Sequence, residues 1–513
     1  MPSRHGLRAS RVAVLGLLAA LLPAGAWASP VLETLGAPEG NGGMQGVVSG
    51  PSAASTYFDP ALLSFADDAF LAGVSVLSDD IGIRLDRRTS GDVPLVVGER
   101  GVLGSDGRPV PNDTVPTAWL ERGCPAGSAT NQCPPPGFTA RPRQADGSGG
   151  KTRAYLALGF VKQVVRDRFT LGMFALLPLS SFTSLRGFYA DEREALFSNS
   201  LHPELFGDRM TALSLSLGAA LRLHRTLSVG ASVGLSLANT ATSRTYVRSS
   251  TDYDQLLLDN SVETGMSFSP VVGVAWRPTE RLRFGAAARA PSSFTLDTTI
   301  TATLPSGTES GTERRETYHD LPWRLAVGAE FDVVKRGTYA MSVTASITHA
   351  TWSTYRDRHG GSPSDYGKAF AWSDTTSGSV GVRHAWGHAR AFFDLSWVPS
   401  PVPPQTGRSN YVDGDRAGIA FGADVDVTVF GLPIRPGVVL GVQRVVPRDV
   451  RKDPSLLRDE VPDDAVLAST RRPVPGREGL QTNDPGWPGF GSGGFVWTGS
   501  FSVAVPFEGG RRR

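Results

Sequence analysis

The sequence contains few cysteines and histidines, and after its N-terminus it has no long hydrophobic run. Its 513 residues include 2 Cys, 8 His and 6 Met, which are too few thiols for a disulfide-dense scaffold. No histidine pair has the spacing of a zinc-protease helix. No apolar run after the N-terminal one reaches the roughly 18 residues of a membrane-spanning helix. We therefore expect no metal, no cofactor and no bundle of membrane helices.

An excess of charge of one sign is also missing. The chain has 51 basic and 49 acidic residues, a net charge of +2, which gives no electrostatic reason to bind nucleic acid. The mean hydropathy is only -0.12 although 40% of the residues are hydrophobic and 59 are glycines. The apolar residues are therefore spread by alternation, and a membrane protein of this composition is built from strands.

The alternation is clearest in residues 211–239, where every second residue is apolar and the residues between are small or polar. A period of two, interrupted by a polar turn at His224 and Arg225, predicts two antiparallel strands. The apolar face suits lipid and the other face suits a narrow lumen. The apolar positions before the turn are Leu213, Leu215, Leu217, Ala219, Leu221 and Leu223.

The same pattern recurs from Ala69 to Phe507 and predicts about fourteen strands, in which short turns alternate with long loops. We therefore expect an all-β fold, a transmembrane antiparallel β-barrel in an outer membrane with both termini periplasmic. The last strand places Phe495, Trp497, Phe501 and Phe507 on one face, like the C-terminal assembly signal of bacterial outer-membrane proteins. The expected partners are outer-membrane lipid, lipopolysaccharide and the outer-membrane assembly machinery.

Two segments precede the predicted barrel. Arg4, Arg8 and Arg11 come before the apolar run 12–22, and small residues follow at 26–28, which predicts a signal peptide over 1–28; a retained anchor is the alternative. Residues 29–68 are rich in Gly, Ser and Ala, with Ser55 and Asp59 as possible helix caps and Pro60 at a first helical position. They predict a compact plug, or else a disordered leader.

Two of the predicted loops carry unusual residues. Cys124 and Cys133 lie close together in a Pro/Gly-rich loop, which in an oxidising compartment predicts a local disulfide. The loop over 180–208 is unusually apolar and predicts capture of a greasy ligand; packing on the barrel rim is the alternative. Its apolar residues are Phe188, Tyr189, Leu196, Phe197, Leu201, Leu205 and Phe206.

Three glycine motifs lack the context that gives them chemistry. The G-x-S-x-G pattern around Ser232 lies inside a predicted strand with no helix after it. Gly489, Gly491 and Gly494 match the dinucleotide-binding pattern G-x-G-x-x-G, but they precede a strand instead of linking a strand to a helix. In the third motif, Ala145 stands where a phosphate-binding loop has its first glycine. We expect no enzyme, with no catalytic residues. A general porin for polar solutes, a lipid-acting enzyme that uses Ser232 and an adhesive barrel remain as alternatives.

Several segments resemble the FadL-like outer-membrane transporters of long-chain fatty acids and aromatic hydrocarbons. Residues 53–62 are similar to the small-residue segment that ends in Asn-Pro-Ala-Gly-Leu in that family, but Asp59 replaces Asn and Leu62 replaces Gly. The tail 508–513 also extends past the expected terminal Phe507. The other similar segments are 321–331, Trp352-Ser353, 372–374, 400–403 and 413–416.

The resemblance implies a hydrophobic-compound channel with fourteen strands and an N-terminal hatch. The ligand is captured outside and leaves sideways into the membrane beside a kinked third strand. Pro178, followed by Ser180, is the candidate for the kink; alternatively, Pro178 only ends the strand. Lateral exit spares an apolar solute the aqueous periplasm. The hatch motif corresponds to Ser55, Thr56, Asp59, Pro60 and Ala61.

Overall fold

The computed structural model describes most of the chain between Val31 and Phe507. The described residues are 31–39, 42–87, 91, 102–108, 151–179, 201–203, 205–206, 213–247, 256–303, 309–356, 362–366, 368–459, 461–482 and 484–507. Several predicted features lie outside these residues. They are the signal peptide 1–28, Cys124 and Cys133, Ser180, the loop residues Phe188, Tyr189, Leu196 and Phe197, and the tail 508–513.

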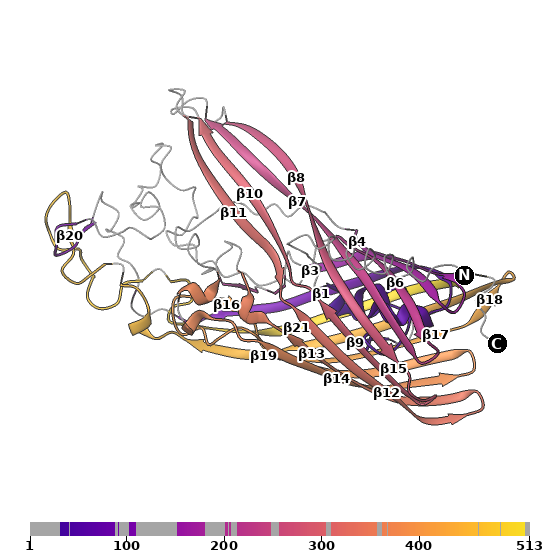
Figure 1. The fold of residues 1–513 in the computed structure, drawn as a ribbon. Helices are drawn as coiled ribbons and strands as arrows, with labels where there is room; N and C mark the ends of the chain where they lie inside the picture. Colours follow the sequence, from indigo (N-terminus) through magenta and orange to yellow (C-terminus); the bar gives the residue numbers. More distant parts are fainter. Residues whose placement is uncertain are drawn as a thin grey trace, which may run out of the picture.

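Fourteen strands form the wall of a single closed antiparallel sheet, as the alternation predicts (Figure 1). Each strand pairs with the next one along the wall, and short turns join the strands at one end. In chain order the wall strands are β1 (Ala69–Leu85), β3 (Lys151–Val165), β4 (Phe169–Pro178), β6 (Leu213–His224), β7 (Leu227–Val247), β8 (Leu256–Trp276), β9 (Leu282–Arg289), β12 (Arg324–Arg336), β13 (Tyr339–Ala350), β14 (Thr375–Trp386), β15 (Ala389–Val398), β17 (Arg416–Val425), β19 (Leu432–Arg451) and β21 (Gly489–Pro506).

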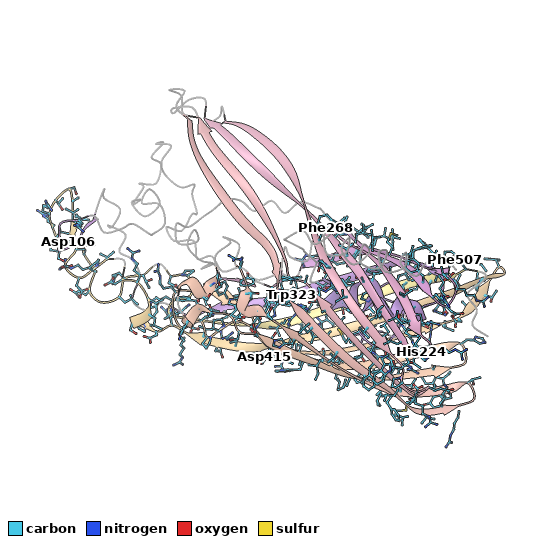
Figure 2. All side chains as sticks on the ribbon, viewed as in Figure 1. Asp106, His224, Phe268, Trp323, Asp415 and Phe507 are labelled. Carbon is cyan, nitrogen blue, oxygen red and sulfur yellow. The ribbon has the colours of Figure 1, made fainter. Side chains whose placement is uncertain are left out.

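The sheet closes between its first and last strands. β1 pairs with β21 from Ala69↔Pro506 to Leu85↔Phe490, and on its other side with β3. No wall strand therefore has an unpaired edge, which is the condition for a barrel in lipid. Figure 2 places His224 and Phe507 toward the same end of the barrel.

The alternation over residues 282–300 predicts one strand, and this prediction is wrong. β9 ends at Arg289, and Ala290 and Pro291 separate it from β10 (Ser292–Thr303). Proline has no N–H to continue the ladder. β10 and β11 (Glu309–Leu321), which the sequence did not predict, form a hairpin that rises from the wall beside the ends of β7 and β8 (Figure 1).

Two further predicted boundaries differ from the structure. The strand expected over 416–430 breaks at Asp426 into β17 and the short β18 (Val427–Val429). The last strand begins at Gly489 and includes the glycines that were expected to precede it. Short pairs and turns complete the loop end: β2 (Val102–Leu103) with β20 (Val466–Leu467), β5 (His202–Pro203) with β16 (Tyr411–Val412), η6 (Trp352–Thr354), η7 (Pro363–Tyr366), η8 (Lys368–Phe370) and η9 (Pro454–Leu456).

The two faces of the wall follow the predicted alternation. On β6, Leu217 and Leu221 are 47% and 44% exposed, whereas Ser214 and Ser216 are 3% and 1% exposed. β12 behaves in the same way, with an exposed apolar face opposite the buried Glu330. Such an outer surface is unfavourable in water and suits hydrocarbon. Trp276 and Phe284 stack at 5.5 Å near a short turn, where an interfacial aromatic girdle is expected.

Residues 31–66 form short helical turns inside this wall. They comprise α2 (Val31–Leu35), α3 (Ser55–Phe58) and η1 (Pro60–Phe65). Asp59 caps η1, because its Oδ1 accepts a hydrogen bond from the Ala61 nitrogen at 2.9 Å, and Pro60 follows at the first helical position. This is the cap that the sequence predicts. Within the described part of the chain, no helix is both long and apolar enough to span a membrane.

Candidate functional site

Glycines on the inward face of the wall allow the N-terminal segment, residues 31–66, to approach the strand backbones. A Cβ atom at Gly273 of β8 would lie 1.9 Å from Asp59 Oδ1. At Gly285 of β9 it would lie 1.9 Å from the carbonyl oxygen of Val47. Both separations are far below van der Waals contact, so only glycine fits these positions and the segment packs directly on the strands.

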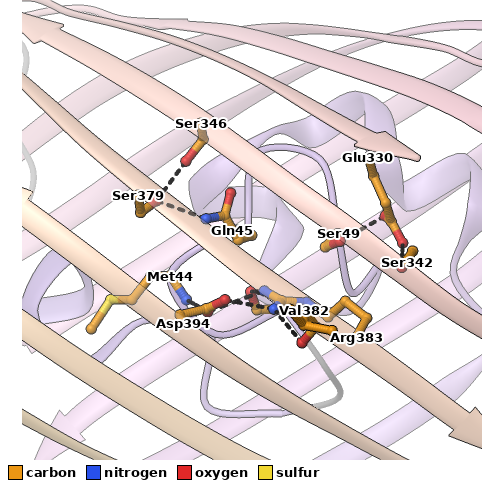
Figure 3. A network of polar contacts seen from close by, with 11 residues as sticks. Met44, Gln45, Ser49, Glu330, Ser342, Ser346, Ser379, Val382, Arg383 and Asp394 are labelled. Atoms are coloured by element: carbon orange, nitrogen blue, oxygen red, sulfur yellow. Dashed lines mark hydrogen bonds and ion pairs between the residues drawn. The ribbon is translucent and has the colours of Figure 1, made fainter. Parts of the chain in front are cut away.

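A buried ion pair on β14 and β15 holds the turn after α2 (Figure 3). Arg383 Nη1 lies 2.5 Å from Asp394 Oδ1, and both side chains are almost fully buried. Arg383 Nη2 donates to the Gly42 carbonyl at 2.8 Å, and the Met44 nitrogen donates to Asp394 Oδ2 at 2.9 Å. The backbone of the segment thus satisfies hydrogen-bonding groups that this pair would otherwise leave unpaired.

Two further side chains of the segment bind polar residues of the wall (Figure 3). Gln45 Nε2 donates to Ser379 Oγ at 2.8 Å, and Ser49 Oγ donates to Glu330 Oε2 at 2.6 Å. Ser342 Oγ donates to the other oxygen of Glu330 at 2.8 Å. These contacts join the segment to Glu330 of β12 and Ser379 of β14.

β7 and β9 bind the backbone of α3. Ser232 Oγ of β7 donates to the Thr56 carbonyl at 2.6 Å. Arg289 of β9 donates to the Tyr57 carbonyl, and its guanidinium lies 3.7 Å from the centre of the Tyr57 ring. Ser232 therefore anchors the segment, and it lies within a continuous strand instead of the strand-to-helix turn of a G-x-S-x-G nucleophile.

The junction between the segment and β1 is fixed by two aspartates. Asp68 Oδ2 lies 2.6 Å from Lys162 Nζ, and its Oδ1 accepts from the Gln163 nitrogen at 2.7 Å. Asp67 pairs with Arg435 at 3.3 Å. Charge-assisted bonds of this kind hold the exit of the segment against both β3 and β19.

The residues predicted as a hatch motif are brought together and buried. Thr56, Asp59 and Ala61 are each 0% exposed, Ser55 is 3% exposed and Pro60 is also buried. Burial raises the pKa of the Asp59 carboxyl well above its usual value, and the hydrogen bond from the Ala61 nitrogen opposes this only in part. The motif is therefore part of the contact between segment and wall.

A cavity of about 190 Å³ lies between the segment and the loop-end half of the wall. Its apolar lining comes from both: Met44, Val47, Tyr57 and Phe58 of the segment, and Leu205, Val271, Leu321, Trp352, Val398 and Pro401 of the wall and loops. Three arginines, Arg289, Arg324 and Arg416, also line the cavity, and Glu33 is the only acid among the lining residues. Serines, threonines and Gln443 complete the lining, so the cavity has apolar and polar walls in similar measure and an excess of positive charge.

The arginines of the cavity retain unused donor atoms. Arg324 pairs with Glu33, yet Arg324 Nε, Arg289 Nη1 and Arg416 Nε are buried without a hydrogen-bond partner. Asp413 interacts electrostatically with Arg416 from the adjoining loop. The positive charge of these arginines at the cavity wall would complement an anionic group in the cavity.

Three residues of the predicted capture loop are described, and all three are buried. Leu201 is 0% exposed and packs with Val412, Val450 and Phe490. Leu205 lines the cavity, and Phe206 lies 5.5 Å below the Arg416 guanidinium. At these three residues the loop packs on the barrel rim, which is the alternative to ligand capture. Leu205 also lines the cavity.

Pro178 and Phe507 lie at the ends of their strands. Pro178 is the last residue of β4, opposite Tyr155, and the pairing of β4 with β6 has no register shift from Phe169 to Leu176. The Phe507 nitrogen donates to the Asp68 carbonyl at 3.0 Å, which joins the end of the barrel to its beginning.

The sequence did not reveal the arginines of the cavity or the aromatic cluster above them. Tyr355 and Trp372 stack at 3.7 Å, and Trp352 and Tyr411 pack against this pair. Strand parity identifies Arg289 and Arg324 as inward residues, but it cannot show that strands far apart along the chain place them around one space.

A closed fourteen-stranded barrel with an apolar outer surface and a filled lumen defines the class: a transmembrane outer-membrane barrel. A family model described as "Outer membrane protein transport protein (OMPP1/FadL/TodX)" matches residues 154–427. The chain belongs to this family. The predicted class of function, outer-membrane transport of the FadL type, is thereby confirmed, and the porin and enzyme alternatives are not favoured.

One solved structure supports the fold, and two others are given for comparison only. A FadL homologue of Pseudomonas aeruginosa superposes with a TM-score of 0.50 at 15% identity, covering 95% of this chain and 99% of the homologue. The P. putida toluene transporter TodX gives 0.44 at 12% identity and covers 92% and 99%. The Ralstonia pickettii toluene transporter TbuX gives 0.42 at 12% identity and covers 94% and 99%. No curated protein matches the chain.

Proposed function

We propose that this protein takes up hydrophobic small molecules that carry an anionic head group, such as long-chain fatty acids. The single observation that carries the proposal is the cavity between segment and wall. Its apolar lining suits a hydrocarbon chain. Its three arginines, set against one lining acid, suit a carboxylate.

The N-terminal segment acts as the hatch of this channel. Its backbone is bound at two places along the wall, by Arg383 and Asp394 of β14 and β15 and by Ser232 and Arg289 of β7 and β9. A segment held in this way closes the lumen to ions and sugars while it forms one face of the ligand cavity. A general porin requires an open lumen, which these contacts oppose.

Capture and release complete the proposed route. The loop over 188–206 receives the ligand outside, and Leu205 brings that loop to the cavity. Release is lateral, beside the end of β4 at Pro178, because an apolar chain moves there directly into hydrocarbon. Both chain termini are periplasmic, since the wall begins and ends at the short-turn end.

The test compares uptake of a labelled fatty acid, a labelled neutral aromatic hydrocarbon and a sugar into vesicles that contain the purified protein. We expect uptake of the fatty acid and no uptake of the sugar. Arg416→Gln should slow uptake of the fatty acid about tenfold, the effect of losing one charge-assisted bond of roughly 1.4 kcal/mol, and should leave uptake of the hydrocarbon unchanged.

Arg390→Gln is the matched control for Arg416→Gln. Arg390 is also a wall arginine, but it pairs with Asp424 at 2.5 Å and does not line the cavity. This control should keep the uptake of the unmodified protein. If Arg416→Gln slows uptake of the fatty acid and of the hydrocarbon equally, the proposed binding of the head group is refuted. Uptake of the sugar by the intact protein would refute the hatch.

A further inference from the structure

The carboxyl group of Asp59 is enclosed without a cationic partner. Asp59 is 0% exposed, and only its Oδ1 is hydrogen-bonded, to the Ala61 nitrogen at 2.9 Å. Its Oδ2 is buried without a hydrogen-bond partner. Among the residues that the structure describes, none forms an ion pair with it. An ionised carboxylate in such a place loses its hydration and receives little in return.

The packing around this carboxyl leaves no space for a bridging water on the side of β8. A Cβ atom at Gly273 would lie 1.9 Å from Asp59 Oδ1 and 3.0 Å from Pro60 Cδ. On the side of β7, a Cβ atom at Gly230 would lie 2.4 Å from the Ala61 nitrogen. The backbones of β7 and β8 therefore leave no room for a water beside Asp59 Oδ1 and the Ala61 nitrogen.

The cations on the neighbouring elements bind other groups. η1 contacts α3, β4, β6, β7 and β8. Arg222 of β6 donates to the Ser64 carbonyl and pairs with Asp167 at 3.2 Å. Arg277, which follows β8, lies 3.5 Å from the centre of the Phe65 ring.

The remaining charged groups on these elements are also accounted for. His224 of β6 contacts Thr226 Oγ1 at 2.9 Å, and Arg289 of β9 binds the Tyr57 carbonyl. β4 has no charged residue. Arg244 of β7 and the acids of β8, Asp259 and Glu263, belong to the parts of those strands beyond Asn239↔Thr264, far along the ladder from Gly273.

We propose that Asp59 is held as a neutral carboxylic acid and that its ionisation unseats the N-terminal segment, so that closure of the channel weakens as the pH rises. The proposal rests on the hatch role of this segment. Burial raises the pKa of Asp59 well above its usual value. The seated state therefore binds the proton more tightly than the released state does.

The sign of the pH dependence follows from this difference. Closure is strongest below the ordinary pKa of an aspartate, about 3.9, and it weakens as the pH rises through the interval up to the raised pKa of the seated state. Each pH unit in that interval shifts the equilibrium by at most about tenfold for one proton. Above the raised pKa the effect levels off.

Glu39 is a second buried acid of the segment and must be separated from Asp59. Glu39 Oε1 accepts a long hydrogen bond of 3.4 Å from the Ala54 nitrogen. Burial raises its pKa as well. It therefore adds a pH dependence of the same sign, and only the difference between the unmodified protein and an Asp59 variant reports on Asp59.

The experiment measures ion leak through the full-length protein in vesicles between about pH 5 and pH 9, the range in which a raised carboxyl pKa acts. We expect the leak to rise with pH, by at most about tenfold per unit. Asp59→Asn keeps the shape of the side chain without its charge and should remove most of this slope. Asp464→Asn, at an exposed loop acid, should keep the slope of the unmodified protein.

A chain that lacks residues 29–65 separates the two claims. It should leak at every pH, and if it stays closed the hatch role itself is refuted. If the deletion leaks but the unmodified protein and Asp59→Asn show the same pH profile, the inference about Asp59 is overturned.

A second measurement is infrared spectroscopy, with the spectrum of Asp59→Asn subtracted so that the band of Glu39 cancels. The C=O stretch of a protonated carboxyl should persist in the infrared spectrum of the unmodified protein at neutral pH, and its weakening on titration should coincide with the onset of leak. A leak that rises with pH while this band stays unchanged would overturn the proposal.

Discussion

The residues that matter most in this barrel are small ones on its inner face. At Gly273 and Gly285, Asp59 and Val47 occupy the space that a side chain would need. The sequence predicts a small or polar inner face from the alternation alone. It does not predict what fills the lumen at each position, because the contacts join residues more than 200 positions apart.

Gly285→Ala should loosen the N-terminal segment. The new Cβ would lie 1.9 Å from the Val47 carbonyl oxygen, so either the strand or the segment must move, at a cost of about 1–3 kcal/mol. The measurement is the free energy of unfolding in detergent together with protease cleavage within residues 31–66. Gly378→Ala is the control, because its Cβ would meet its nearest atom at 3.8 Å. Equal behaviour of the two variants would contradict the packing.

Lys452 gives a pH dependence of the opposite sign from that of Asp59. It is 6% exposed, its Nζ donates to the Gly407 and Ser409 carbonyls at 2.7 Å, and burial lowers its pKa to about 8. The unfolded chain therefore holds the proton over a range in which the folded chain has released it, and stability rises between pH about 8 and about 10.5, by about 3 kcal/mol at most.

The unfolding midpoint of the unmodified protein, compared with that of Lys452→Met over this alkaline range, measures the effect. The difference between the two proteins should grow with pH. A difference that stays constant from neutral to alkaline pH would show that Lys452 keeps its proton throughout.

At the scale of elements, the period of two shows where the strands lie, and a proline marks the strand end that the period misses. The sequence predicts β6 almost residue by residue and β7 as far as Asn239, because apolar and small or polar residues alternate there, but β7 continues to Val247. It fails at 282–300, where the alternation continues past Pro291 but the strand leaves the wall. Hydrophobic periodicity reports which face a residue occupies, and it says nothing about which neighbour the strand pairs with.

Ser232 matches a catalytic motif in the sequence, but its position in a strand gives it a structural contact instead. It lies within β7 and donates to the Thr56 carbonyl of α3 at 2.6 Å. Ser232→Ala should lower the free energy of unfolding by about 1 kcal/mol, because one hydrogen bond is lost. It should leave the rate of ester hydrolysis unchanged. Unfolding and hydrolysis of a chromogenic ester are measured on the same preparation. Hydrolysis by the unmodified protein that disappears in the variant would support the enzyme alternative.

At the scale of the whole molecule, strand count, closure and class could be predicted, whereas the site could not. The alternation of short turns with long loops requires an even number of strands, and the structure closes with fourteen. The cavity needs three dimensions, because its arginines come from β9, β12 and β17. Their common location depends on the shear of the barrel, which no local pattern encodes.

The most direct test of the account is a disulfide between the N-terminal segment and the wall, formed in native membranes. A Cβ at Gly328 would lie 3.1 Å from that of Val48, near the spacing of about 3.8 Å in disulfides. In a chain without Cys124 and Cys133, Val48→Cys with Gly328→Cys should cross-link and leave sugar flux at zero. Val48→Cys with Glu280→Cys, at an exposed turn, should not cross-link. A segment that fails to cross-link to Gly328→Cys, or that reacts equally with both positions, would contradict a hatch seated inside the barrel.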